Sequence, residues 1–145
     1  MFFYQPDEKE TYFKTPIYDE TADAAKQVAE ALVVAKREKK QVLLQFGANW
    51  CVWCHVFHHF LDTDRTIQKK IQSVYVLVLI DVGNGHNEST VKEYGEPTRF
   101  GLPVIVVLDP DGKQLVTQSV AEFGENGGYN SLKVLAFLNQ WALKK

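Results

Sequence analysis

The sequence predicts one α/β domain of three layers, in which helices cover both faces of a central mixed sheet. Apolar runs at 42–46 and 74–81 are separated by helical segments, which is typical of strands joined by a helical crossover. A third run at 104–108 leads through an Asp-Pro-Asp-Gly turn into residues 115–120, and this pattern predicts a hairpin. With 145 residues, the chain has room for one such core.

The first part of the chain is expected to supply an extended segment, a helix and a strand. Residues 1–18 show no sustained periodicity, so we expect them to lie in extended form over a domain formed by residues 19–145. A helix is predicted over 21–39, after Asp19 and Thr21 as candidate caps, with its apolar face at Val28, Ala31, Leu32 and Ala35. Residues 42–46 are apolar on both sides and predict a central strand.

The remaining elements follow the same reasoning. A helix that starts at residue 51 carries a stripe of large apolar side chains, Trp53, Phe57, Phe60 and Leu61. A second helix is predicted over 64–72, with Ile67 and Ile71 inward, before a second central strand at 74–81. A polar loop at 83–89 leads to a short helix that ends near Tyr94. The last helix, 131–143, is expected to bury its leucine-rich face, namely Leu132, Leu135, Ala136 and Leu143.

Composition excludes several classes of function. The formal net charge of −2 provides no general attraction to nucleic acid or to an anionic membrane surface. No apolar stretch reaches the length of a membrane-spanning helix, and residues 1–8 lack the basic and apolar segments of a secretory signal. We therefore expect a domain that binds neither nucleic acid nor membrane and is a monomer.

The two cysteines of the chain lie three positions apart, directly after the first predicted strand. A Cys-x-x-Cys pair that opens a helix is typical of dithiol–disulfide exchange. The positive end of the helix dipole favours a thiolate by about 2 kcal/mol, which would lower a cysteine pKa from about 8.5 to about 7. Cys51, at the helix edge, is therefore the predicted nucleophile, and Cys54, one turn further in, the more buried resolving thiol.

These residues resemble the active site of the thioredoxin superfamily. The likeness is carried by the strand 42–46 with the following Gly-Ala-Asn-Trp-Cys-Val-Trp-Cys, by Asp81 at the end of the next strand, and by Gly101-Leu102-Pro103; it covers residues 17–145. The resemblance implies a thioredoxin fold in which Pro103 is cis and faces the cysteines. It also implies that the backbone of Leu102 binds substrate. Pro97 is the competing candidate, but no apolar strand follows it directly.

More narrowly, the chain is similar to exported bacterial thioredoxin-like proteins of the disulfide reductase or isomerase kind. Their Gly-Ala-x-Trp-Cys-x-x-Cys motif is present, and so is the Asp81-Val82-Gly83 loop. The resemblance implies an enzyme, a thiol:disulfide oxidoreductase that acts on protein thiols and disulfides in the periplasm or another exported location. It also implies a partner reductase or oxidase that the sequence does not identify, and no cofactor beyond the Cys51–Cys54 disulfide. Trp50, Val52 and Trp53 would surround that disulfide and contact the substrate.

Two departures from plain thioredoxins leave the redox direction open. Val52-Trp53 stands between the cysteines where thioredoxins have Gly-Pro. Gln45 stands six residues before Cys51, where thioredoxins have a buried acid that takes the proton of the resolving cysteine. Because an amide cannot act as that base, water or His55 is the candidate for proton transfer.

Three other interpretations of the cysteines remain open. Cys-x-x-Cys-His is also the attachment pattern for c-type haem, although here it follows a buried strand in an α/β pattern. A metal site is a second possibility, since Cys51, Cys54, His55 and His58 lie along one helix face. Ligands of structural sites usually come from two elements, which argues against it. The third is a non-catalytic thioredoxin-fold binding or chaperone module.

Overall fold

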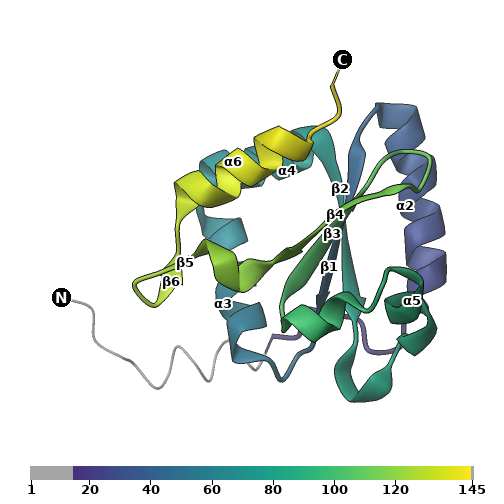
Figure 1. Cartoon of the computed structure of the whole chain (residues 1–145), viewed down its shortest axis with the longest axis horizontal. Helices are drawn as coiled ribbons and strands as arrows, with labels where there is room; N and C mark the ends of the chain where they lie inside the picture. The colour runs from purple at the N-terminus through teal and green to yellow at the C-terminus, as the bar shows by residue number, and fades with distance from the viewer. Residues whose placement is uncertain (1–14, 145) are drawn as a thin grey trace.

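Four strands form the central sheet, in the order β2-β1-β3-β4 (Figure 1). In the computed structural model, which describes residues 15–144, β1 (Gln41–Gly47) pairs parallel with β2 (Tyr75–Asp81). On its other side β1 pairs antiparallel with β3 (Val104–Leu108), and β3 pairs antiparallel with β4 (Gln114–Ser119). The predicted mixed sheet and three-layer architecture are confirmed. Residues 1–14 of the predicted extended segment lie outside the described residues.

β1 is buried along its whole length because its side chains enter two cores in alternation. Leu44 and Phe46 belong to the core under α2 (Ala24–Glu38), which covers one face of the sheet. Leu43 belongs to the core on the other face, which α3 (Val52–Thr63), α4 (Arg65–Val74) and α6 (Ser131–Trp141) cover (Figure 1). The fully buried β1 thus leads the chain to the end of the sheet where the cysteines lie.

The predicted cap of the first helix was wrong. α2 begins after Asp23, whose carboxylate accepts a hydrogen bond from the backbone N–H of Ala25. Asp19 instead accepts from the N–H and hydroxyl of Thr21 in the turn ahead of the helix. Since Asp favours turns and caps for the same local hydrogen bonds, the sequence alone did not separate the two roles.

Two helix faces also differ from the predictions. Trp53 is not part of the core: it is 49% exposed, and its ring meets that of Tyr129 edge-on at 6.0 Å between centroids. The leucine-rich face of the last helix is not its buried face either, since Leu132 is 77% exposed. α6 instead buries the bulkier stripe that contains Val134, Phe137 and Leu138.

Two features of the sheet region were missed. β2 lies at an edge of the described sheet rather than in its centre, and its Leu77 is 36% exposed. A small hairpin of β5 (Gly124–Glu125) and β6 (Gly128–Tyr129) projects beside the main sheet (Figure 1). Its turn residues Asn126 and Gly127 both have positive φ, 50° and 77°. Asn-Gly is the strongest short hairpin signal, so the sequence did carry this element.

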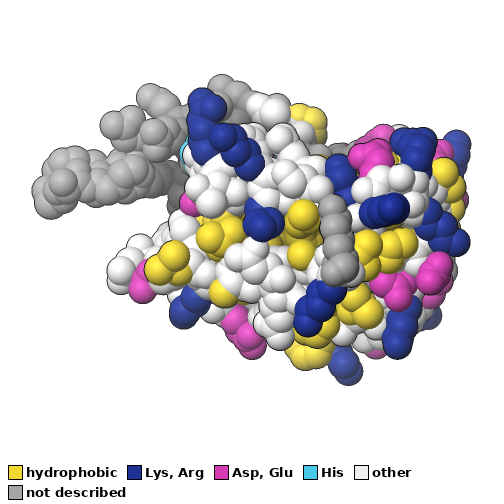
Figure 2. All heavy atoms as spheres, turned by 90° about the horizontal axis from the view of Figure 1, so that it is seen from above, with side chains coloured by type: hydrophobic (Ala, Val, Ile, Leu, Met, Phe, Trp, Pro, Cys, Tyr) yellow, Lys and Arg dark blue, Asp and Glu magenta, His cyan; other side chains and the backbone are white. Residues whose placement is uncertain are grey.

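The end of the molecule away from the cysteines carries Lys and Arg side chains scattered among hydrophobic and acidic ones (Figure 2). Lys36 and Arg37 lie in the last turn of α2, where cations complement the helix dipole. Among the described residues on this face, basic side chains alternate with other kinds of side chain and form no continuous patch. No helix within residues 15–144 combines the length and apolarity needed to cross a membrane.

Candidate active site

The two cysteines lie where β1 ends and α3 begins. Cys51 is the N-cap of α3, and its sulfur accepts a hydrogen bond at 3.2 Å from the backbone N–H of Cys54. Both cysteines are free thiols; Cys51 is 8% exposed, whereas Cys54 is fully buried. The expected orientation, with Cys51 outside and Cys54 inside, is therefore what the structure shows.

The loop before β3 faces the cysteines across the sheet edge. Phe46 pairs with Val104, the first residue of β3, so the residues just before β3 lie beside the segment that leads to Cys51. The Leu102–Pro103 peptide bond is cis, as predicted for Pro103 rather than Pro97. The carbonyl oxygen of Leu102 lies 3.8 Å from the Cys51 sulfur, within reach of its S–H. A backbone carbonyl thus borders the Cys51 sulfur.

The surroundings shift the pKa values of the two thiols in opposite directions. The pKa of Cys51 falls from 9.0 to about 7, first because the Cys54 thiol donates a hydrogen bond to it, and then because the amides of Cys54 and Trp53 do so. The pKa of Cys54 is raised, first by that same pairing and then by burial. One thiolate is therefore available at neutral pH, and its charge belongs on Cys51.

This lowered pKa predicts the pH dependence of alkylation at Cys51. Between pH 6 and 9 the thiolate fraction of a group with a pKa of about 7 rises only about tenfold, whereas that of a free cysteine with a pKa of about 8.5 rises more than two hundredfold. We expect the iodoacetamide rate of the reduced protein to follow the shallower curve, with a midpoint near pH 7. Mass spectrometry that counts single adducts measures it. A midpoint above about pH 8 would contradict the assignment.

A groove lies beside the cysteines and has a volume of about 530 Å³. It is lined by Trp53, Leu102 and Pro103 on one side and by the β5–β6 hairpin on the other. Trp50 and Val52, which flank Cys51 in the sequence, are exposed as well, at 59% and 40%. The structure thus leaves the predicted substrate residues on the surface around Cys51, except Pro103, which is buried. Their role in binding stays a prediction.

Tyr18 is a member of the site that the sequence interpretation missed. It is 3% exposed and packs with Ala48 and both cysteines in one cluster. The side chain of Asn49 holds it there: its Oδ1 accepts from the N–H groups of Ile17 and Tyr18, and its NH2 group donates to the backbone carbonyl oxygen of Tyr18, at 2.8 to 3.0 Å. No periodicity marks residues 15–18, so only the three-dimensional structure reveals this contact.

The histidines after the cysteines have other partners. His55 is buried, and its Nε2 lies 2.6 Å from the carbonyl oxygen of Asn49. His58 lies 3.5 Å from the carboxylate of Asp62, one turn further along α3. In the described part of the chain, no three Cys, His, Asp or Glu side chains come together as a metal centre requires. The predicted alternative of a metal held by the Cys/His cluster therefore has no geometric support.

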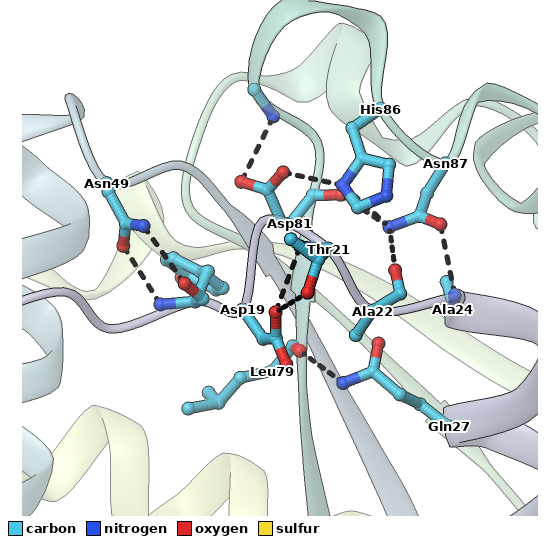
Figure 3. Close-up of polar contacts among 12 residues, drawn as sticks. Asp19, Thr21, Ala22, Ala24, Gln27, Asn49, Leu79, Asp81, His86 and Asn87 are labelled. Atoms are coloured by element: carbon cyan, nitrogen blue, oxygen red, sulfur yellow. Dashed lines mark hydrogen bonds and ion pairs between the residues drawn. The ribbon is translucent and has the colours of Figure 1, made fainter.

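A polar network supports the loop that follows β2, next to Trp50. The buried carboxylate of Asp81 pairs with His86 at 2.7 Å, and the Asn87 NH2 group donates to the carbonyl oxygen of Asp81 (Figure 3). Asn87 also accepts from the N–H of Ala24, which connects this loop to α2. Gly83 lies within this loop, where an added Cβ would come 3.2 Å from the Trp50 indole nitrogen. The network thus fixes the loop on which Trp50 rests.

A strand that ends in a dithiol at a helix start, opposite a cis-proline in a mixed sheet, defines a thioredoxin-fold domain. The chain belongs to the thioredoxin-like family, whose signature matches residues 23–110. The match includes both cysteines and the cis-proline.

Individual relatives agree with this assignment. The crystal structure of a disulphide isomerase from Xylella fastidiosa Temecula1 is 35% identical with a TM-score of 0.77, covering 87% of this chain and 96% of that one. The thiol:disulfide interchange protein DsbD of Actinobacillus pleuropneumoniae serotype 5b is 32% identical over 102 residues, 70% of this chain and 16% of the relative. The oxidised C-terminal domain of Neisseria meningitidis DsbD is 23% identical with a TM-score of 0.60, covering 82% of this chain and 96% of that one, which shows the fold alone.

The chain is thus a homologue of thiol:disulfide interchange enzymes. It spans about a sixth of the length of the curated relatives it matches.

Proposed function

We propose that this domain is a thiol–disulfide oxidoreductase that acts on protein disulfides. The observation that carries the proposal is the split between the two thiols: Cys51 caps α3 with a pKa of about 7, while Cys54 lies buried beneath it with a raised pKa. A thiolate at neutral pH with a protonated neighbour one turn away is what a two-step exchange needs.

The proposed reaction has two exchanges. The Cys51 thiolate attacks a substrate disulfide, a Cys51–substrate disulfide forms, and the first substrate thiolate leaves and takes up a proton. Cys54 then attacks the Cys51 sulfur, which releases the second substrate thiol and leaves a Cys51–Cys54 disulfide. The substrate gains two electrons and the domain loses two. A partner reductase must return them, or a partner oxidase must remove them if the domain runs in the other direction.

We further propose that an extended substrate segment lies in the 530 Å³ groove between the Leu102–Pro103 bond and the β5–β6 hairpin. The carbonyl oxygen of Leu102, 3.8 Å from the Cys51 sulfur, would pair with substrate backbone as an added strand does. Trp53 and Tyr129, which meet edge-on, would form the apolar wall. These features support specificity for unfolded or extended polypeptide around the disulfide.

The acidity of Cys51 supports the reducing direction. A pKa of about 7 equals that of thioredoxin, whose potential is about −270 mV, whereas the oxidant DsbA combines a pKa of about 3.5 with about −120 mV. A less stabilised thiolate makes the dithiol form less favoured, so the disulfide is a weaker oxidant.

No cofactor beyond the two cysteines is proposed. The resemblance to exported proteins supports a location outside the cytoplasm.

Catalysed reduction of insulin tests the proposal. With dithiothreitol as reductant, the domain should precipitate insulin chains well ahead of dithiothreitol alone. The same protein with both thiols blocked by iodoacetamide is the control and should show no acceleration. Titration against dithiothreitol redox buffers should then give a potential closer to about −270 mV than to −120 mV. If the native and blocked proteins act alike, the domain is a binding module and not an oxidoreductase.

A further inference from the structure

A tyrosine occupies the place next to the resolving cysteine. An added Cβ on Gly47 would come 2.8 Å from the Cys54 sulfur and closer still to the Tyr18 hydroxyl, so both atoms pack over the same glycine. The Tyr18 side chain packs in one cluster with Cys54 and lowers the pKa of the Cys54 thiol. Both side chains are buried, at 3% and 0% exposure. Tyr18 therefore lies beside the Cys54 thiol in the interior of the domain.

The hydrogen bonds around Tyr18 have a direction. Gln45 is fully buried, and its Nε2 donates to the Tyr18 oxygen at 3.0 Å. Since that bond occupies a lone pair of the phenol oxygen, the phenol proton remains available for Cys54. The other amide atom, Gln45 Oε1, has no hydrogen-bond partner among the described residues. Among the described residues the Gln45 amide thus makes only the bond in which it donates, and that bond orients the Tyr18 hydroxyl.

We propose that Tyr18, oriented by Gln45, stabilises the Cys54 thiolate in the resolving step. The inference rests on the proposed exchange reaction. Tyr18 donates a hydrogen bond to the sulfur as it becomes anionic, and it is not consumed. The Cys54 proton ends on the departing substrate thiolate, so the step converts a mixed disulfide and one thiol into the Cys51–Cys54 disulfide and one free thiol.

Tyr18 acts as a donor and not as a base. Burial raises its pKa well above 10, so the phenolate is not available to remove a proton. Two titratable side chains act on Cys54 from the elements packed against it, Cys51 at the start of α3 and Tyr18 ahead of α2, and Cys54 in turn raises the pKa of Tyr129 on β6. Cys51 raises the pKa of Cys54, whereas the backbone of Ala48 lowers it first and the Tyr18 side chain lowers it after that. A hydrogen bond to a charged, buried sulfur is stronger than one between neutral groups.

The reaction of the reduced domain with dithiobis(nitrobenzoate) tests this step separately from the first one. Cys51 attack releases one coloured thiolate, and Cys54 attack on the mixed disulfide releases a second. In Tyr18→Phe we expect the second phase to slow about tenfold and its pH midpoint to rise by about one unit, because a charge-assisted hydrogen bond is lost. The first phase should change less than about twofold, since Cys51 has other donors.

Tyr75→Phe is the matched control, because Tyr75 is also buried and its hydroxyl donates to the carbonyl oxygen of Leu138 at 2.7 Å, far from the cysteines in the fold. It should leave both phases unchanged. The double variant Tyr18→Phe, Gln45→Leu removes the amide that the single variant leaves unpaired, and it should show the same shift. If the second phase of either Tyr18 variant keeps the wild-type pH midpoint, the inference is wrong. If wild type lacks the fast first phase, the proposed function fails instead.

Discussion

Cys51→Ser is expected to reduce insulin no faster than dithiothreitol does alone, while Cys54→Ser is expected to stall after its first attack. The reason is that the thiolate is the nucleophile, and a serine hydroxyl at the start of α3 stays protonated at neutral pH. Cys54→Ser keeps the Cys51 sulfur and the amides that donate to it. It should therefore accumulate a Cys51–substrate disulfide that lacks an internal thiol to release it.

The two variants separate nucleophile from resolving thiol by what they trap. After incubation with insulin and without reductant, Cys54→Ser should appear on non-reducing gels as an adduct with an insulin chain, and Cys51→Ser should not. Each variant serves as the control for the other, since both carry the same Cys→Ser change within one turn of α3. Trapping by Cys51→Ser and not by Cys54→Ser would reverse the assignment, and equal trapping would show that either thiol can attack first. The 8% exposure of Cys51 against 0% for Cys54 is the physical basis for expecting otherwise.

The sequence was sufficient for the fold and for the place of the two cysteines in it. β1 is buried on both faces and therefore apolar throughout, and the cysteines follow it directly, so local pattern and tertiary position coincide there. Pro103 could be chosen over Pro97 because an apolar strand follows it, and its peptide bond is cis in the structure. These are features in which neighbours along the chain are also neighbours in space.

What the sequence did not provide are contacts between distant segments. Tyr18 reaches Gln45 across 27 positions and Cys54 across still more, and nothing in the local pattern of residues 15–18 indicates a buried partner. The exposure of Leu132 shows a related limit, since two apolar stripes compete on α6 and the bulkier one packs against α4 and the sheet. The Asn126-Gly127 pair is a hairpin signal, but it lies in a glycine-rich stretch for which no strand was predicted.

Gly47→Ala is expected to lower the free energy of unfolding of the reduced domain by about 3 kcal/mol, at the upper end for overpacking. The added methyl carbon would overlap the Tyr18 phenol and lie 2.8 Å from the Cys54 sulfur. The backbone has little freedom to move away, because Gly47 pairs with Asp81 and its carbonyl oxygen accepts from the N–H of Val82 at 2.9 Å. Urea unfolding in reducing buffer measures the loss.

Gly128→Ala is the control, since an added Cβ there meets no atom closer than 3.9 Å. It should change stability by less than about 0.5 kcal/mol. Because the Tyr18 hydroxyl is the first atom that the new methyl meets, Gly47→Ala and Tyr18→Phe should be coupled, with a combined loss at least about 1 kcal/mol smaller than the sum. Because the ring carbon Cζ, 2.5 Å from the added Cβ, remains in Phe, strict additivity would mean that the hydroxyl itself does not take part in the overlap at Gly47. If coupling is found, displacement of Tyr18 in Gly47→Ala should also slow the second phase of the thiol reaction, which connects the packing of one glycine to the chemistry of the resolving cysteine.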